Sequence, residues 1–196
     1  MSEARAYGPS ALLTPANAIT LARLAVTPIL LSSILEVGDA WSTVALWILL
    51  AGSDGVDGWL ARKQGTTRSG AFLDPLADKF LVLGAMVCLV SNDVFGWLPV
   101  AIIAFREISL TLYRSYLGKR GVSLPARTSA KVKTVVQEIA VGLALLPVSA
   151  DHVPWLAEAV LWAAVVLTVW SGAQYLLDAR RTSVAGPSRR GSGHAL

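Results

Sequence analysis

Apolar residues dominate six long stretches of the chain, and short polar or charged segments separate them. The stretches lie at residues 18–41, 42–60, 75–92, 97–117, 132–150 and 154–177. Each is about as long as one helical bilayer crossing, which takes ~20 residues. Only helices and closed barrels can span lipid, and these stretches lack the polar and apolar alternation of barrel strands. The pattern predicts an all-α integral membrane protein with six transmembrane helices.

The composition supports a bilayer as the solvent. Of the 196 residues, 54% are hydrophobic and 15% are charged, whereas soluble proteins carry about 25% charged residues. Cys88 is the single cysteine, so an intrachain disulfide is excluded. Residues 1–15 contain no apolar core with a cleavage-like flank, and we therefore expect no removable signal peptide.

The segments between the stretches differ in the sign of their charge. One set carries Glu36 and Asp39, then Asp93, then Asp151, without Lys or Arg. The other set and the end of the chain are basic, with Arg62, Lys63, Arg68, Arg114, Lys119, Arg120, Arg127, Lys131, Lys133, Arg180, Arg181, Arg189 and Arg190. The positive-inside rule places both termini and the basic loops in the cytoplasm. Orientation thus explains the net charge of +4, and we expect no nucleic-acid partner because no aromatic residues interleave with the basic ones.

Four aspartates lie within or beside the apolar stretches. Asp54 and Asp57 are three residues apart and Asp74 and Asp78 are four apart, so each pair shares a helix face. An antiparallel hairpin would bring both pairs to one cytoplasm-facing polar cavity. Unpaired carboxylates would repel one another there unless divalent cations compensated their charge. A ligand set of oxygens alone suits magnesium or manganese.

Structural explanations cover part of this set. Asp74 before Pro75 has the pattern of a helix N-cap, and Asp57 could pair with Arg62. Asp78 beside Lys79 could be ordinary helix-end charge. These explanations leave Asp54 without a partner in the sequence, and the metal site remains the favoured prediction.

The segment from Asp54 to Asp78 resembles the signature of the CDP-alcohol phosphatidyltransferases. Its spacing is D-x2-D-G-x2-A-R-x7-G-x3-D-x3-D, and the fixed residues are Asp54, Asp57, Gly58, Ala61, Arg62, Gly70, Asp74 and Asp78. Seven residues separate Arg62 from Gly70 where the family pattern has one more. The loop is therefore shortened, while the spacing within each half is kept.

The resemblance implies an enzyme that transfers a phosphatidyl group from CDP-diacylglycerol to an alcohol with release of CMP. It implies two bound ions, Mg²⁺ or Mn²⁺, held by Asp54, Asp57, Asp74 and Asp78, with Asp78 also as general base. The opening segment from Pro15 to Pro28 is similar to the family's as well. The residues expected to contact the CDP-lipid are Asn17, Thr20, Gly58, Ala61, Arg62 and Thr67. Helix packing, helix propensity and membrane orientation are the alternative explanations for Gly58, Ala61 and Arg62, respectively.

Two later segments, Phe105–Arg114 and Ser129–Gln137, are most similar to the phosphatidylglycerophosphate synthases of this family. They imply glycerol 3-phosphate as the acceptor, a small dianion that needs convergent cations. The candidates for binding its phosphate are Arg106, Arg114, Arg127, Lys131 and Lys133. Arg106 could instead pair with Glu107 or Glu138, and orientation alone could explain Lys131 and Lys133.

Other functions remain open at this stage. The same chemistry could use inositol phosphate or phosphatidylglycerol as acceptor. A cation transporter would need acidic residues along a path to the outer face, but the clustered aspartates stop at the cytoplasmic end. The expected organisation is a cytoplasmic segment at 1–16, a six-helix catalytic domain at 17–178 and a mobile basic tail at 179–196. The resemblance further implies a homodimer in a bacterial inner membrane.

Overall fold

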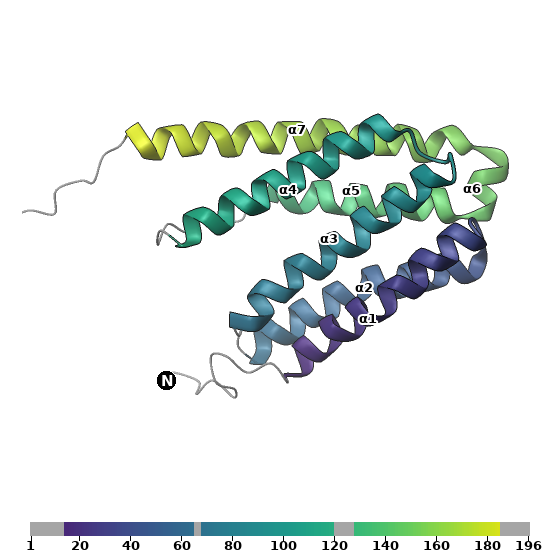
Figure 1. The fold of residues 1–196 in the computed structure, drawn as a ribbon, viewed down its shortest axis with the longest axis horizontal. Helices are drawn as coiled ribbons and strands as arrows, with labels where there is room; N and C mark the ends of the chain where they lie inside the picture. Colours follow the sequence, from purple (N-terminus) through teal and green to yellow (C-terminus); the bar gives the residue numbers. More distant parts are fainter. Residues whose placement is uncertain (1–13, 65–67, 120–127, 185–196) are drawn as a thin grey trace, which may run out of the picture.

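The computed structural model describes residues 14–64, 68–119 and 128–184, and this part of the chain is entirely helical. Figure 1 shows helices that run back and forth along one long axis. Their bounds are α1 (Pro15–Glu36), α2 (Trp41–Gln64), α3 (Arg68–Ser91), α4 (Trp97–Lys119), α5 (Thr128–Leu145), α6 (Pro147–His152) and α7 (Pro154–Val184). The prediction of an all-α fold is confirmed for the described residues.

The acidic connections between the helices lie together at one end of the bundle. Helices α1, α3 and α5 begin at the end where α2, α4 and α7 finish (Figure 1). The opposite end holds the connections at 37–40 and 92–96 and the short helix α6. The acidic side chains lie in these segments or directly before them, and they are Glu36, Asp39, Asp93 and Asp151. The sequence predicted this alternation.

Local signals in the sequence explain how α1 begins and ends. The Thr14 hydroxyl accepts a hydrogen bond from the backbone N–H of Asn17 at 3.2 Å, and Pro15 occupies the first turn, where its missing N–H costs nothing. At the other end, Gly38 has φ +71° and donates its N–H to the carbonyls of Ser33 and Ile34. Glycine adopts this left-handed conformation without steric cost, so α1 ends and the chain turns into α2.

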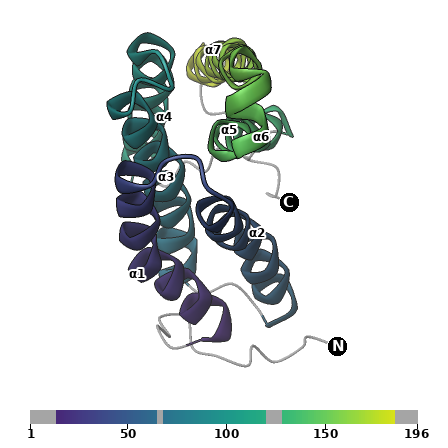
Figure 2. The same cartoon turned by 90° about the vertical axis from the view of Figure 1, so that its right-hand side faces the viewer.

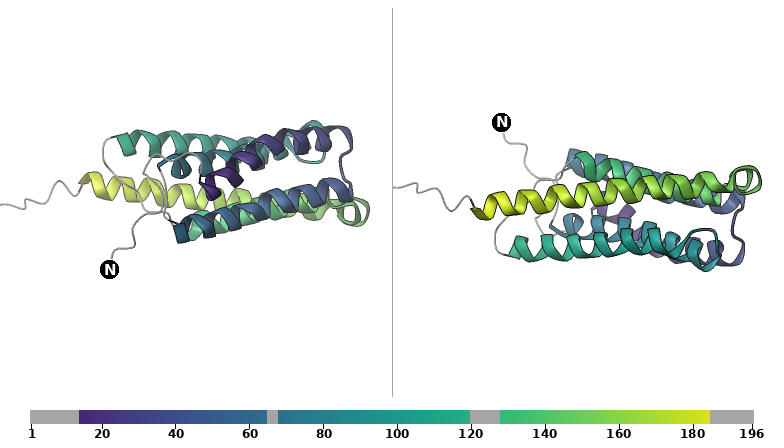
Figure 3. Two further views of the ribbon diagram at one scale, coloured as in Figure 1. Left: turned by 90° about the horizontal axis from the view of Figure 1, so that it is seen from below. Right: turned by 90° about the horizontal axis from the view of Figure 1, so that it is seen from above.

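The helices form two groups. Figure 2 shows α1, α3 and α4 on one side and α5, α6 and α7 on the other. The packing is most extensive between α1 and α3 and between α5 and α7, and α2 contacts both α1 and α5. Two further views confirm the lengthwise course of the long helices (Figure 3). The signature segment, on α2 and α3, therefore sits beside α1 at the end of the bundle where α1 begins.

Among the helix boundaries that differ from the predicted stretches, two lie at a proline. The third helix begins at Arg68, not at 75, so Asp74 lies inside α3 and is not an N-cap. The fifth stretch is divided into α5 and α6 at Leu146, because Pro147 cannot donate the backbone hydrogen bond that would continue α5. Both differences arise at a proline, which begins a helix in one case and lies inside one in the other.

Length and hydropathy alone mark two of the described helices as able to cross a membrane. They are Asn17–Glu36 and Pro154–Gln174. The charged residues within α3 and α4, among them Asp74, Asp78 and Glu107, lower the hydropathy of those helices.

Candidate active site

Of the second pair of signature aspartates, Asp74 contacts α1 directly. Asp74 and Asp78 are both partly buried on α3, one helical turn apart. The Thr20 hydroxyl of α1 donates a hydrogen bond to Asp74 Oδ1 at 2.8 Å, and Thr20 itself is fully buried. Thr20, for which the family resemblance implies a nucleotide contact, thus contacts a signature carboxylate directly.

Asn17 lies one turn before Thr20 on α1 and is also buried. Its backbone N–H completes the Thr14 cap. Its predicted contact with the nucleotide is not tested by the structure and remains a prediction.

Several predicted site residues lie outside the described side chains. The backbone of most of them is helical, but their side chains are not described, and the loop residues Thr67 and Arg127 lie outside the described residues altogether. This group comprises Asp54, Asp57, Gly58, Ala61, Arg62, Thr67, Arg114, Arg127 and Lys131. Their roles remain predictions.

The donor set that the structure does describe fits a hard cation. Asp74, Asp78 and Thr20 offer oxygen atoms only, and Asp74 keeps further lone pairs after accepting the Thr20 hydroxyl. Among the described residues, no group of three or more His, Cys, Asp or Glu side chains is placed to hold a metal ion. The four-carboxylate site therefore depends on Asp54 and Asp57.

Arg23 is a buried cation that the sequence analysis missed. It lies near the middle of α1, is 2% exposed, and donates from Nε to Ser53 Oγ of α2 at 3.0 Å. Arg23 therefore joins α1 to the residue of α2 that directly precedes Asp54, the first signature aspartate. The signal was available, because an arginine in an apolar span needs a reason as much as an aspartate does.

A second polar group is centred on Glu107 of α4. Its carboxylate forms ion pairs with Lys79 of α3 at 3.0 Å, with the neighbouring Arg106 at 2.7 Å and with Lys133 of α5 at 2.5 Å. Arg106 also donates to Ser171 Oγ of α7 at 2.7 Å. We call Lys79, Arg106, Glu107 and Lys133 the Glu107 cluster.

The Glu107 cluster joins two predicted acceptor residues and adds one that was missed. Arg106 and Lys133 are brought together, and the alternative pairing of Arg106 with Glu107 is confirmed. Lys79 was interpreted only as helix-end charge next to Asp78. No local pattern indicates that Lys79 faces α4, because that depends on how α3 and α4 pack.

Comparison with known proteins identifies the family of the chain. The family model for CDP-alcohol phosphatidyltransferase matches residues 13–170. The chain belongs to this family. The match includes both the signature helices and the Glu107 cluster, and the chain is therefore a phosphatidyltransferase. Enzymes of this family generally use divalent metal ions.

Three relatives illustrate the similarity of this phosphatidyltransferase to bacterial proteins. A probable phosphatidylglycerophosphate synthase of Mycobacterium tuberculosis is 39% identical over 173 residues, which cover 85% of this chain and 81% of the relative. A CDP-diacylglycerol–glycerol-3-phosphate 3-phosphatidyltransferase of Bacillus subtilis is 40% identical over 178 residues, covering 81% and 91%. A protein of the same name from Sodalis glossinidius is 42% identical over 142 residues, covering 69% and 76%.

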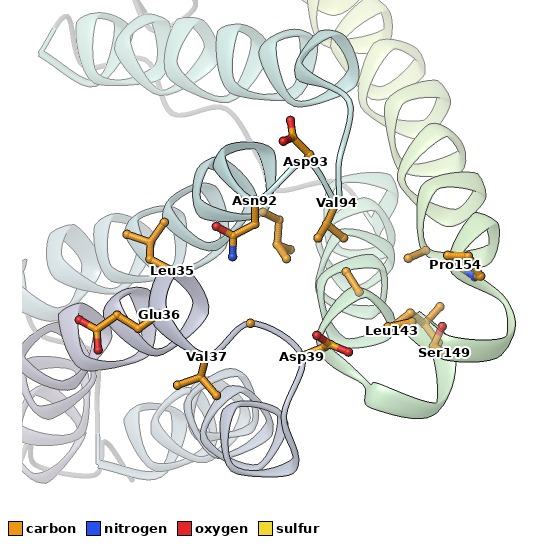
Figure 4. Close-up of a pocket in the computed structure, with 15 residues that line it drawn as sticks. Leu35, Glu36, Val37, Asp39, Asn92, Asp93, Val94, Leu143, Ser149 and Pro154 are labelled. Carbon is orange, nitrogen blue, oxygen red and sulfur yellow. The ribbon is translucent and has the colours of Figure 1, made fainter.

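A cavity of about 560 Å³ lies at the other end of this phosphatidyltransferase (Figure 4). It is lined by the α1–α2 and α3–α4 connections and by parts of α5, α6 and α7. None of the predicted site residues lines it. The cavity is therefore separate from the signature, and the predicted cytoplasm-facing cavity is not tested by it.

Proposed function

We propose that this phosphatidyltransferase moves the phosphatidyl group of CDP-diacylglycerol to glycerol 3-phosphate, giving phosphatidylglycerophosphate and CMP. The observation that carries the proposal is the name shared by the Bacillus subtilis and Sodalis glossinidius relatives, which states both this donor and this acceptor. The buried cations of the Glu107 cluster support a phosphorylated acceptor, because burying several positive charges together is costly without an anion.

The proposed setting is a bacterial inner membrane that the six long helices cross. The proposed catalytic domain is residues 17–178, with a cytoplasmic segment at 1–16 and a basic tail from 179, into which α7 continues as far as Val184. Both termini and the signature end of the bundle face the cytoplasm, where the water-soluble acceptor is available. The working form is a homodimer, as the family resemblance implies.

Asp54, Asp57, Asp74 and Asp78 would hold two divalent cations, Mg²⁺ or Mn²⁺. When bound, such ions neutralise the negative charge of the pyrophosphate and of the departing CMP. Thr20 fixes one oxygen of Asp74, so that carboxylate is oriented before any substrate arrives. Asn17, Gly58, Ala61, Arg62 and Thr67 form the proposed surface for the CDP group.

Asp78 is the proposed general base. It takes the proton from the acceptor hydroxyl as the oxygen of that hydroxyl bonds to the phosphorus bearing the diacylglycerol. The bond from this phosphorus to the CMP oxygen breaks, and CMP leaves with the bonding electrons. Arg106 and Lys133, with Arg114, Arg127 and Lys131, are the proposed cations for the acceptor phosphate.

The test uses the purified full-length protein in detergent with CDP-diacylglycerol and Mg²⁺. Glycerol 3-phosphate, inositol phosphate and phosphatidylglycerol are added in separate reactions, and released CMP and the lipid product are measured. We expect CMP release and phosphatidylglycerophosphate with glycerol 3-phosphate. Faster turnover with another acceptor would overturn the acceptor assignment, and ion transport by the protein in sealed vesicles, without CMP release in detergent, would overturn the enzyme assignment.

A further inference from the structure

The Glu107 cluster carries more positive than negative charge. Three cationic side chains share the single Glu107 carboxylate, and among the described residues they form no other ion pair. Arg106 Nε is buried and has no hydrogen-bond partner in that part of the chain. The cluster therefore keeps both charge and donor capacity for an anion.

The members of the cluster differ in how far they reach solvent. The side chain of Lys133 is 4% exposed and that of Arg106 is 12% exposed, whereas Lys79 is 26% exposed. Glu107 is 8% exposed and holds the Lys79 ammonium through Oε2. Lys79 is thus the least buried described cation of the cluster and the one that leaves most room for a ligand.

Lys79 is also the cation next to the proposed base. Adjacent residues on a helix project about 100° apart, so Asp78 and Lys79 leave α3 on different faces. Asp74, one turn before Asp78, faces α1 through Thr20, and Lys79 faces α4 through Glu107. A small molecule with a hydroxyl at one end and a phosphate at the other matches this pair of neighbouring groups.

We propose that Lys79 binds the phosphate of the acceptor and that Glu107 is the positioning residue that holds the Lys79 ammonium for it. This inference rests on the proposed function, because it takes a phosphorylated alcohol as the acceptor. The negative charge of the phosphate is attracted by the excess positive charge of the cluster. The Glu107 carboxylate offsets the repulsion among the three cations and so keeps them in place. The acceptor hydroxyl then lies toward Asp78.

The experiment measures kcat and the KM of each substrate for Lys79→Met and Lys79→Arg in the full-length enzyme. Lys79→Met should raise the KM for glycerol 3-phosphate at least tenfold and leave the KM for CDP-diacylglycerol within about threefold, since a charge-assisted contact to the acceptor alone is lost. Lys79→Arg should restore most of the acceptor affinity. Equal changes in both KM values, or an unchanged acceptor KM, would overturn the inference.

Glu107→Gln tests the positioning role. It should raise the acceptor KM in the wild-type background and have a smaller effect when combined with Lys79→Met, because part of its action passes through Lys79. Glu36→Gln, an exposed carboxylate at the last residue of α1, is the control and should leave both KM values unchanged. Fully additive effects of Glu107→Gln and Lys79→Met would contradict the positioning role.

A variant without turnover is examined by thermal unfolding with and without glycerol 3-phosphate, in the presence of CMP and Mg²⁺. Ligand that binds the folded state raises Tm, so wild type and Asp78→Asn should shift and Lys79→Met should not. A preserved shift in Lys79→Met would overturn the inference. Failure of wild type to turn over glycerol 3-phosphate, with activity on another alcohol, would instead overturn the proposed function.

Discussion

At the residue scale, Asp78 is the proposed general base, and replacing it tests the chemical step apart from the binding of the lipid. It follows Asp74 by one turn on α3 and is partly buried. Asn has nearly the same shape but cannot accept a proton from the acceptor hydroxyl. Asp78→Asn should therefore lower kcat by about 10²-fold or more while Tm stays close to that of wild type.

CMP release and thermal unfolding in detergent check this prediction. The matched control is Asp93→Asn in the α3–α4 connection, where φ is +58°. Asparagine tolerates that left-handed backbone, so the control should retain both activity and Tm. Activity of Asp78→Asn near the wild-type value would remove Asp78 as the base.

Ser53 tests whether Arg23 ties α1 to the signature. Its hydroxyl accepts from Arg23 Nε and donates to the Leu50 carbonyl of its own helix at 2.7 Å. Ser53→Ala leaves a buried guanidinium donor without this acceptor, which should cost about 1–3 kcal/mol of unfolding free energy. The measurement is the denaturation midpoint of the detergent-solubilised protein.

Ser32→Ala is the control for Ser53→Ala. Ser32 also donates to a carbonyl of its own helix, that of Ile29 at 3.0 Å, but it is exposed and bridges no other helix. Its replacement should change the unfolding free energy by less than about 0.5 kcal/mol. Equal losses for the two variants would show that the contact with Arg23 contributes no stability.

At the element scale, hydropathy predicted which segments are helical better than where they begin. The six stretches each correspond to a long helix, but α3 begins at Arg68, before the predicted start at 75. The sequence suggested a cap at Asp74 because proline is favoured in a first helical turn. The tertiary contact of Asp74 with Thr20, which no local pattern encodes, accompanies the longer helix.

Helices α1 and α3 pack closely at Gly84, against the side chain of Leu31. A Cβ there would lie 3.0 Å from Leu31 Cδ1 and 3.2 Å from Leu31 Cδ2. The end of the Leu31 side chain can move, so Gly84→Ala should be nearly neutral. Gly84→Leu should lower the unfolding free energy by about 1–3 kcal/mol through overpacking.

Gly52→Leu is the matched change at a position where no neighbour lies within 4 Å of the new Cβ. In thermal unfolding, the Tm of Gly84→Leu should be lower than the Tm of Gly84→Ala and of Gly52→Leu. If Gly52→Leu lost as much stability as Gly84→Leu, the loss would come from the leucine itself rather than from the α1–α3 contact.

At the scale of the whole molecule, the sequence predicted the alternating course of the helices but not the Glu107 cluster. The course follows from hydropathy and from the alternation of acidic and basic connections, both of which are local patterns. The cluster gathers residues from α3, α4 and α5 with a Ser171 contact from α7. Which face of each helix turns inward is decided by packing, so Lys79 could not be assigned to it from spacing alone.

The proposed orientation of the bundle rests on its charge asymmetry. In a background with Cys88→Ala, a single cysteine at Asp93 should react with a membrane-impermeant maleimide added to intact cells, and one at Ser188 should react only in inverted vesicles. The reason is that the basic connections and the tail favour the cytoplasmic side. Replacing Cys88, the single cysteine of the chain, removes background labelling. Because Cys88 is buried, this replacement does not change the charged surface. Labelling of Ser188→Cys from outside the cell would place the signature on the wrong side for an acceptor made in the cytoplasm, and the proposed orientation would be wrong.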